Sequence, residues 1–205
     1  MRTLCFDIGQ VLVRFDPQPA LERLAALSDR EAHAIWQAFA STDLLSRFEK
    51  GLLATEDFHQ AACRLLGTQI PLARFCEIWA DIFDPEATIP SSLLRALGQH
   101  YRLIALSNTD PIHFPYLRGR YDLFDCFEDF VLSYQVGARK PEREIYQVAI
   151  ARGGGDAAAI LFIDDSAEYV AAAAALGIVA RQFRSLLGLL EDLSALGVWP
   201  LPTEG

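Results

Sequence analysis

Short, largely apolar runs along the chain predict a set of buried strands. Five runs are strand candidates: residues 3–6, 103–106, 129–132, 160–163 and 178–180. Apolar runs of this length are typical of strands that are covered on both faces of a sheet.

Segments with helical character separate most of these strands. Helices are expected at residues 91–99, 141–152, 166–176 and 186–196. Strands that alternate with helices indicate a parallel sheet with helices packed on both faces. The predicted fold class is therefore α/β, with a Rossmann-like sheet.

Residues 16–83 interrupt this alternation, because their apolar side chains recur at helical spacing without a convincing strand pattern. Ser28-Asp29 is expected to cap one helix of this segment, and Pro71 is expected near the first turn of another. We therefore predict a core made of residues 1–15 and 84–205, with residues 16–83 inserted as a small helical domain.

Composition and charge narrow the functional classes. The 205 residues are 52% hydrophobic and 22% charged, which predicts a folded protein with a sizeable core. The net charge of −9 disfavours binding to nucleic acid, which depends on Lys and Arg contacts with phosphates. The longest uncharged stretch, residues 169–180, is shorter than the ~20 apolar residues of a membrane span.

The cysteines and the N-terminus bear on the cellular compartment. Cys5, Cys63, Cys76 and Cys126 are scattered and form no CxxC motif. Asp7 comes too early for the apolar region of a signal peptide, so we expect reduced thiols in a cytoplasmic protein.

Acidic residues follow two of the predicted strands, with Asp7 after the first and Asp164-Asp165 after residues 160–163. The carboxyl ends of parallel strands meet at one edge of a sheet, where ligands bind. Two carboxylates ~4 Å apart repel by ~4 kcal/mol at an effective dielectric constant of 20. A hard divalent cation relieves this repulsion, so the pattern predicts a Mg²⁺ site of the kind that usually serves phosphates.

Candidate phosphate ligands stand near the same edge. Ser107, Asn108 and Thr109 end another predicted strand and offer hydroxyl, amide and backbone N–H groups. Lys140, just before a predicted helix, supplies the positive charge that an acidic protein needs in order to bind an anion.

In this order the residues resemble the four motifs of the haloacid dehalogenase-like (HAD) hydrolases. The motifs stand here as Phe6-Asp7-Ile8-Gly9-Gln10-Val11-Leu12, Ser107-Asn108, Lys140-Pro141 and Asp164-Asp165. The resemblance covers essentially the whole chain, and residues 16–83 are similar to the family's helical cap. Glu49-Lys50-Gly51 is similar to the cap of a subgroup that includes a bacterial α-D-glucose 1-phosphate phosphatase and the phosphatase domain of epoxide hydrolase.

The resemblance implies a nucleophile and a metal site. Asp7 would attack phosphorus and form an aspartyl-phosphate. Asp7, Asp165 and the backbone carbonyl of Gly9 would hold Mg²⁺, and Asp164 would be a direct or outer partner of the ion.

The resemblance also implies how a substrate is held. Ser107 and Lys140 would bind the transferring phosphoryl group, and Asn108 would lie beside the phosphate or the substrate. The expected activity is a Mg²⁺-dependent phosphatase for a small phosphorylated metabolite, with a sugar phosphate as one candidate.

Two positions depart from the common pattern of the family. Gly9 stands where most of these phosphatases have a second Asp that acts as general acid and base, although the sugar-phosphatase subgroup also has Gly there. Tyr169 stands where Asp or Asn is usual, which would weaken support for the metal.

Two alternative functions stay open at this stage. A 2-haloacid dehalogenase would use Asp7 to displace halide without a metal. A catalytically degenerate member of the family would bind a phosphorylated ligand or a partner protein. The sequence decides neither the substrate nor the oligomeric state.

Overall fold

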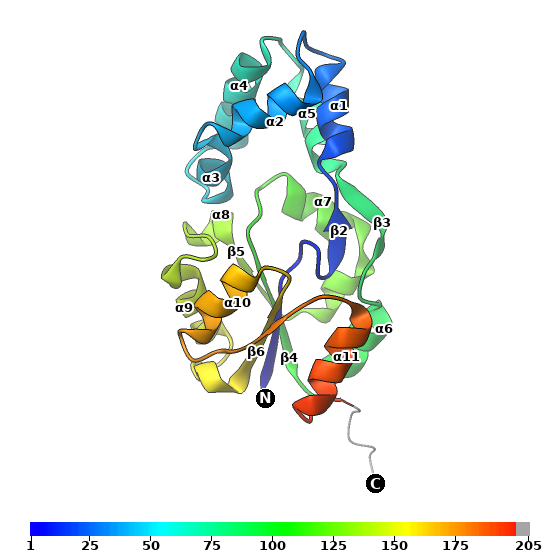
Figure 1. Ribbon diagram of the computed structural model, residues 1–205, viewed down its shortest axis with the longest axis vertical. Helices are drawn as coiled ribbons and strands as arrows, with labels where there is room; N and C mark the ends of the chain where they lie inside the picture. The colour runs from blue at the N-terminus through cyan, green and yellow to red at the C-terminus, as the bar shows by residue number, and fades with distance from the viewer. Residues whose placement is uncertain (200–205) are drawn as a thin grey trace.

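The structure, a computed structural model, describes residues 1–199. Its main sheet is parallel, with the strand order β5-β4-β1-β6-β7 (Figure 1). The strands are β1 (Thr3–Phe6), β4 (Arg102–Ser107), β5 (Asp129–Leu132), β6 (Ile160–Asp164) and β7 (Val179–Gln182). All five predicted strands are therefore present, and the Rossmann-like α/β class is confirmed.

Helices cover both faces of this sheet. They are α6 (Ser91–Gly98), α7 (His113–Arg120), α8 (Ser133–Val136), α9 (Arg143–Arg152), α10 (Ala167–Ala174) and α11 (Leu186–Ala195), with 3-10 turns at Asp122–Cys126 and Ala157–Ala159. Leu4 and Phe6 of β1 pack in one buried cluster with α6 and α11. Cys5, between them, points to the other face and packs in a second cluster with α9 and α10. This alternation makes β1 the buried centre of the sheet.

Five further helices form a unit of their own, which we call the helical unit. It comprises α1 (Gln18–Ala25), α2 (Ala32–Ala40), α3 (Leu44–Glu49), α4 (Thr55–Leu66) and α5 (Leu72–Ala80). Figure 1 shows these helices grouped beyond the carboxyl end of the sheet. Their apolar faces meet in a separate buried cluster in which Phe48 and Phe58 stack with ring centroids 4.0 Å apart.

The helical unit is connected to the sheet by a two-stranded antiparallel ribbon, β2 (Val13–Phe15) and β3 (Phe83–Ala87). Neither strand of this ribbon was predicted: β2 has only three residues, and Asp84, Pro85 and Glu86 of β3 are poor strand formers. Pairing with β2 holds this segment extended. Along the chain, β2 ends just before residue 16, and β3 begins at Phe83, so the ribbon brackets the inserted segment.

Helix starts within the helical unit follow the sequence in part. Pro71 immediately precedes α5, as predicted. The expectation for Ser28-Asp29 is wrong: α2 begins at Ala32 and its N-terminal residue is Glu31, whose side chain makes no capping hydrogen bond. Within residues 1–199, none of the helices is long and apolar enough to cross a membrane.

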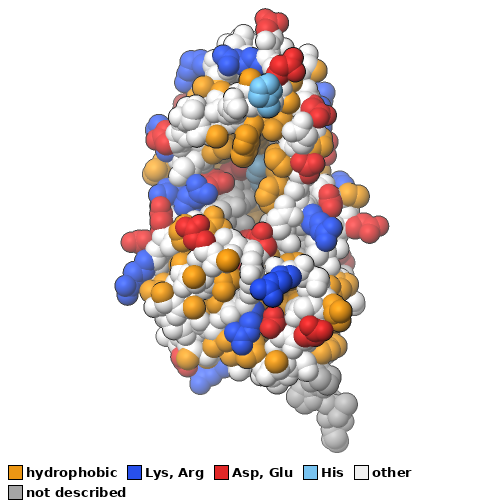
Figure 2. Space-filling view, in the orientation of Figure 1, with side chains coloured by type: hydrophobic (Ala, Val, Ile, Leu, Met, Phe, Trp, Pro, Cys, Tyr) orange, Lys and Arg blue, Asp and Glu red, His pale blue; other side chains and the backbone are white. Residues whose placement is uncertain are grey.

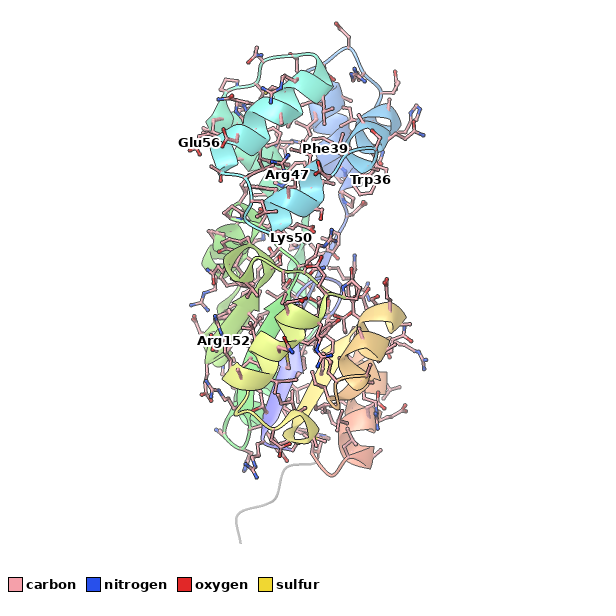
Figure 3. All side chains as sticks on the ribbon, turned by 90° about the vertical axis from the view of Figure 1, so that its left-hand side faces the viewer. Trp36, Phe39, Arg47, Lys50, Glu56 and Arg152 are labelled. Atoms are coloured by element: carbon pink, nitrogen blue, oxygen red, sulfur yellow. The ribbon has the colours of Figure 1, made fainter. Side chains whose placement is uncertain are left out.

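The end of α3 lies against the core at Gly51. This residue has φ of +66°, and a Cβ built on it would be 2.1 Å from the carbonyl oxygen of Tyr134 in α8. Two ion pairs flank the contact: Lys50 with Glu142, and Glu49 with Arg139, whose Nη2 and Oε2 are 3.1 Å apart. Figure 3 shows Lys50 at the end of the helical unit that faces the core. The approach is therefore close enough to require glycine.

We predict that Gly51→Ala loosens this contact. Any side chain at positive φ costs about 1–2 kcal/mol, and the clash with Tyr134 adds roughly 1–3 kcal/mol. Gly67→Ala is the matched control, because Gly67 has φ of +71° but open space around its Cβ position. Urea denaturation should give a clearly larger loss of unfolding free energy for Gly51→Ala. Equal losses of unfolding free energy in the two variants would show that the contact with Tyr134 does not require glycine at position 51.

Candidate active site

A buried lysine joins two carboxylates at the carboxyl edge of the sheet. Lys140 Nζ lies 2.7 Å from Asp7 Oδ1 and 2.6 Å from Asp164 Oδ2. The lysine is 1% exposed, Asp7 is 7% exposed and Asp164 is fully buried. Three predicted site residues from distant parts of the sequence therefore meet in one ionic cluster.

The sheet and one loop bring these groups together. Asp7 directly follows β1 and Asp164 ends β6, and these neighbouring strands pair Phe6 with Ile163. Lys140 comes from the loop between α8 and α9. The sheet topology thus fixes the positions of Asp7 and Asp164. The position of Lys140 depends instead on how the loop is held.

Asn108 holds that loop. Its Oδ1 accepts a hydrogen bond from the backbone N–H of Lys140 at 2.7 Å, and its Nδ2 donates to the Lys140 carbonyl at 3.0 Å. Both ends of the amide are therefore engaged with the lysine backbone. The expected contact of Asn108 with substrate stays a prediction, but its positioning of Lys140 is evident.

Burial and charge pairing act in opposite directions on the ionisable groups of the cluster. Burial raises the pKa of the Asp7 carboxyl above its usual range, although the Lys140 ammonium opposes this shift. Burial acts to lower the pKa of Lys140, but Asp7 and Asp164 outweigh it, and the net shift is upward. Lys140 is thus held as a cation. Both polar contacts of Asp7 within the described residues use Oδ1, accepting from Lys140 and from the Ile8 N–H at 2.7 Å, so Oδ2 is left for other partners.

A third carboxylate completes a candidate metal site. Asp7, Asp164 and Asp165 each offer an oxygen, and these oxygens lie within 4.8 Å of one another. Asp164 is already engaged, because Oδ2 contacts Lys140 and Oδ1 accepts from the Ser166 N–H at 2.8 Å. Oxygen-rich, net-negative sets of this kind suit a hard divalent cation. The geometry therefore fits Mg²⁺, with Asp7 and Asp165 the freer of the three.

A side chain at Gly9 would displace the ring of Phe15, a contact that the sequence did not show. A Cβ at Gly9 would lie 2.9 Å from Cε1 of Phe15, which comes from β2. The ring therefore occupies the space next to the position where most related phosphatases carry their second Asp. The φ angle of Gly9 is not positive, so ring packing rather than backbone strain limits this position.

Tyr169 also has a different role from the one its position suggested. Its ring centroid lies 5.1 Å from Lys140 Nζ, and the Phe162 centroid lies 5.7 Å from the same atom. A cation over an aromatic face is stabilised electrostatically. Tyr169 therefore supports the lysine, a contact that only the tertiary structure reveals.

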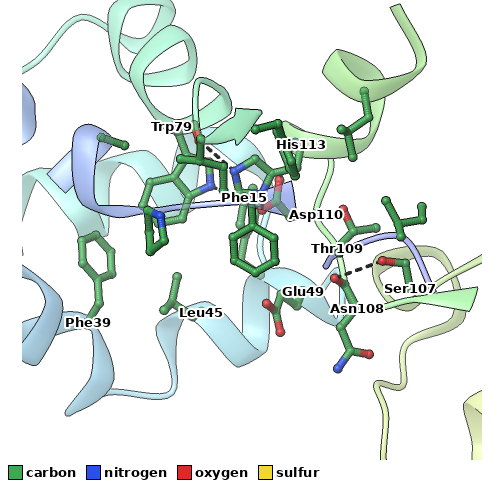
Figure 4. Close-up of a pocket in the computed structure, with 18 of the residues that line it drawn as sticks. Phe15, Phe39, Leu45, Glu49, Trp79, Ser107, Asn108, Thr109, Asp110 and His113 are labelled. Atoms are coloured by element: carbon green, nitrogen blue, oxygen red, sulfur yellow. Dashed lines mark hydrogen bonds and ion pairs between the residues drawn. The ribbon is translucent and has the colours of Figure 1, made fainter. Parts of the chain in front are cut away.

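A cavity of about 280 Å³ lies beside this cluster. Gly9, Ser107, Asn108 and Thr109 line its end at the sheet, and the helical unit, the β2–β3 ribbon and α7 line much of the rest. Figure 2 shows the surface hollowed between the helical unit and the core, and Figure 4 shows the lining side chains. Ser107 and Asn108, both predicted as substrate ligands, therefore border a space that can hold a small molecule.

A buried histidine also lines the cavity. His113 Nδ1 lies 2.7 Å from Asp110 Oδ2, and Nε2 lies 2.7 Å from the backbone carbonyl oxygen of Trp79 in α5. Because that carbonyl can only accept, Nε2 must donate. Asp110 already accepts from two backbone N–H groups and from the Trp79 indole, so its carboxylate form is favoured. The histidine is thus held as an imidazolium that ties the core to the helical unit.

The pKa shifts agree with that ion pair. Burial acts to lower the pKa of His113, but Asp110 outweighs it and the pKa is raised. Burial acts to raise the pKa of Asp110, but His113 and three hydrogen bonds outweigh it and the pKa is lowered. Stability from His113 is present below its unfolded pKa of ~6.5 and is lost as pH rises through the folded value. Stability from Asp110 is lost only at acidic pH, as pH falls through its lowered value.

We predict that His113→Gln costs roughly 3 kcal/mol of unfolding free energy near pH 6, because it leaves a buried carboxylate unpaired. The difference from the wild type should shrink toward pH 9, where the wild-type histidine loses its charge. Urea denaturation across this range measures both effects, with the exposed His100→Gln as control. A pH-independent difference would contradict the imidazolium assignment.

Lys140→Met should destabilise the protein by roughly 3–5 kcal/mol in the presence of chelator, because Asp7 and Asp164 are then buried without their cation. Adding Mg²⁺ should recover part of this loss, and it should raise the Tm of the variant more than that of the wild type. Arg95→Met is the control, since its pair with Asp122 is largely exposed and such a pair is worth at most ~1 kcal/mol. If both variants were equally stable without metal, Lys140 would not be the balancing charge.

Comparison with known proteins places this site in a family. Residues 1–177 match the haloacid dehalogenase-like hydrolases. The chain is 29% identical over 202 residues to a sesquiterpene phosphatase from Aspergillus oryzae, covering 93% of this chain and 94% of that protein. It is 24% identical over 177 residues to a D-ribitol-5-phosphate phosphatase from Bacteroides thetaiotaomicron, covering 83% and 85% respectively.

A solved structure agrees with these sequence matches. A HAD family enzyme from Bacteroides thetaiotaomicron, in complex with magnesium and inorganic phosphate, has a TM-score of 0.80 and 26% identity to this chain. The match covers 91% of this chain and 96% of that one. The family match, the shared fold and the order of the four motifs lead to the same conclusion: the chain belongs to the haloacid dehalogenase-like hydrolases.

Proposed function

We propose that the protein is a Mg²⁺-dependent phosphatase that hydrolyses a small phosphorylated metabolite through an aspartyl-phosphate on Asp7. The observation that carries this proposal is the Asp7–Lys140–Asp164 cluster beside a cavity, with Asp165 within 4.8 Å of both other carboxylates. Two relatives named as phosphatases, and a related structure that holds magnesium and phosphate, support it.

Asp7 is the proposed nucleophile. Its Oδ1 is held by Lys140 and by the Ile8 N–H, so the carboxylate is fixed while Oδ2 attacks phosphorus. The bond between phosphorus and the ester oxygen breaks, and the phosphoryl group passes to Asp7. Water then attacks phosphorus, which releases inorganic phosphate and restores the carboxylate.

Lys140 stabilises the negative charge that the phosphoryl oxygens carry during transfer. Because it is buried and held by Asn108, it needs little reorganisation at the moment of reaction. Ser107, which is 3% exposed and lines the cavity, is the proposed hydroxyl ligand of the phosphoryl group.

Asp7, Asp165 and the Gly9 carbonyl are the proposed ligands of Mg²⁺, and Asp164 fixes Lys140 nearby. When bound, the ion would offset the charge of the carboxylates and of the phosphate. Since Gly9 carries no side chain and Phe15 fills the adjacent space, the leaving oxygen takes its proton from water or from a residue of the helical unit.

We also propose that residues 16–83 act as a cap on a core of residues 1–15 and 84–205. Residues 16–83 supply just over half of the residues that line the cavity, and the helical unit has its own buried cluster. A cap in this position excludes water from the reacting phosphate and selects the substrate.

Asp7→Asn tests the chemistry. The amide is nearly isosteric but a poor nucleophile, so we expect turnover of an aryl phosphate to fall at least 10³-fold with the fold retained. Wild-type activity should vanish with chelator and return with Mg²⁺. The control is Asp16→Asn, because the Asp16 carboxylate accepts a hydrogen bond from the backbone N–H of Gln18 at the start of α1.

Wild-type rates in Asp7→Asn would contradict the covalent mechanism. Metal-independent release of chloride from a 2-chloroacid, with no release of phosphate from phosphate esters, would instead support the dehalogenase alternative. Circular dichroism of the variant must match the wild type for either reading to hold.

A further inference from the structure

The cavity beside the cluster is chemically divided. At the sheet end it meets Gly9, Ser107, Asn108 and Thr109, next to the proposed nucleophile. Away from the sheet, most of the lining is hydrocarbon and aromatic, and its largest apolar members are Phe15, Trp36, Phe39, Phe48, Trp79 and Phe83. A phosphate held at Asp7 would therefore direct the rest of its ester into an apolar space.

Glu49 is the one charged residue that the helical unit contributes to the lining, as far as the described residues show. Its carboxylate faces Arg139, with Oε2 and Nη2 3.1 Å apart. Glu49 stands at the end of α3 near the sheet, and Figure 4 shows it between Leu45 and Asn108, next to the ring of Phe15. The other charged side chains of the lining, Asp110 and His113, belong to the core and are paired with each other.

Most other polar groups of the lining already have partners. Both ring nitrogens of His113 are bonded, and the Trp79 indole N–H donates to Asp110. Both ends of the Asn108 amide contact Lys140. A polyol placed here would give up hydrogen bonds to water without finding equivalent partners, which is unfavourable.

The size of the cavity sets the size of the ligand. A dry apolar cavity of about 150 Å³ holds one benzene molecule. The volume here, about 280 Å³, is almost twice as large. It therefore accommodates roughly eight to twelve carbon atoms by the same scale.

Trp36 shows where a longer chain would leave. Its side chain lines the cavity and is nevertheless 48% exposed. A large aromatic side chain that is both exposed and part of an apolar lining gains contacts when a hydrocarbon covers it. This places the open end of the cavity at α2.

From these features we infer that the substrates of this site are phosphate monoesters of apolar alcohols, with a hydrocarbon group of about eight carbons or more, and not polyol or sugar phosphates. The inference rests on the proposed phosphatase function and specifies its substrate class. The reaction is the one described above: the alcohol leaves with a proton, and water releases the phosphoryl group from Asp7.

A homologous series tests the inference. With Mg²⁺ present, kcat/KM for n-alkyl phosphates from ethyl to octyl should rise by about fourfold per added methylene, until the cavity is full. n-Octyl phosphate should exceed D-ribitol 5-phosphate and α-D-glucose 1-phosphate by at least 100-fold in kcat/KM. Equal or better turnover of either polyol phosphate would overturn the inference while leaving the phosphatase proposal intact.

Matched variants locate the effect. Leu45→Asn places an amide in the apolar lining, and we expect it to lower the octyl-to-ethyl ratio of kcat/KM at least tenfold. Leu52→Asn is the control, because Leu52 is 61% exposed on the same part of the chain and is not in the lining. If both variants kept the wild-type ratio, the hydrocarbon would bind elsewhere.

A binding measurement separates this inference from the chemistry. Trp36 and Trp79 line the cavity, so 1-octanol and n-octyl phosphate should change tryptophan fluorescence saturably in Asp7→Asn. D-Ribitol 5-phosphate should produce no comparable change, and Leu45→Asn should weaken the octanol response. Saturable octanol binding without turnover of any phosphate would sustain the apolar site and refute the phosphatase. The absence of octanol binding would refute the apolar site whatever the turnover.

Discussion

The structure of this site depends on one buried cation. Lys140 lies between Asp7 and Asp164 and is 1% exposed, so neither the two carboxylates nor the lysine could be buried alone. Burying unpaired charges costs several kcal/mol each, and the pairing offsets that cost. Asn108 fixes the backbone of the lysine, and Tyr169 and Phe162 lie against its ammonium group. The ends of β1 and β6, the loop that carries Lys140 and the two aromatic rings therefore all contribute to holding the same ammonium group.

The same cluster connects the fold to the cavity. The parallel sheet brings the ends of β1, β4 and β6 to one edge, and the β2–β3 ribbon carries the helical unit over that edge. Contacts at Gly51, Glu49, Lys50 and His113 attach the helical unit to the core. Two of these polar groups, Glu49 and His113, also line the cavity, where each is paired with a charged partner, whereas most of the remaining lining is apolar. The polar interactions therefore hold the two parts together around a largely apolar space.

Much of this architecture could be predicted from the sequence, because its signals are local. Apolar runs predicted the five strands of the main sheet but neither strand of the ribbon, and the polar residues that end three of them indicated where the site lies. Contacts between distant segments could not be predicted in this way. Nothing near Gly9 shows that Phe15 fills the adjacent space, and nothing near Tyr169 shows that its ring supports Lys140. β3 was missed because its residues favour turns and only its partner strand makes it extended. The polarity of the cavity depends on which faces of five helices point inward, so the sequence left a sugar phosphate as a candidate.

The central claim is that Asp7, held by Lys140, accepts a phosphoryl group. The most direct measurement is mass spectrometry of peptides from enzyme that has been quenched in acid during turnover of n-octyl phosphate or an aryl phosphate with Mg²⁺. The account predicts a phosphoryl group on the peptide that contains Asp7, absent after treatment with hydroxylamine and absent in Asp7→Asn. A phosphoryl group on a different residue, or steady turnover with none trapped on Asp7 under conditions that preserve acyl phosphates, would contradict it.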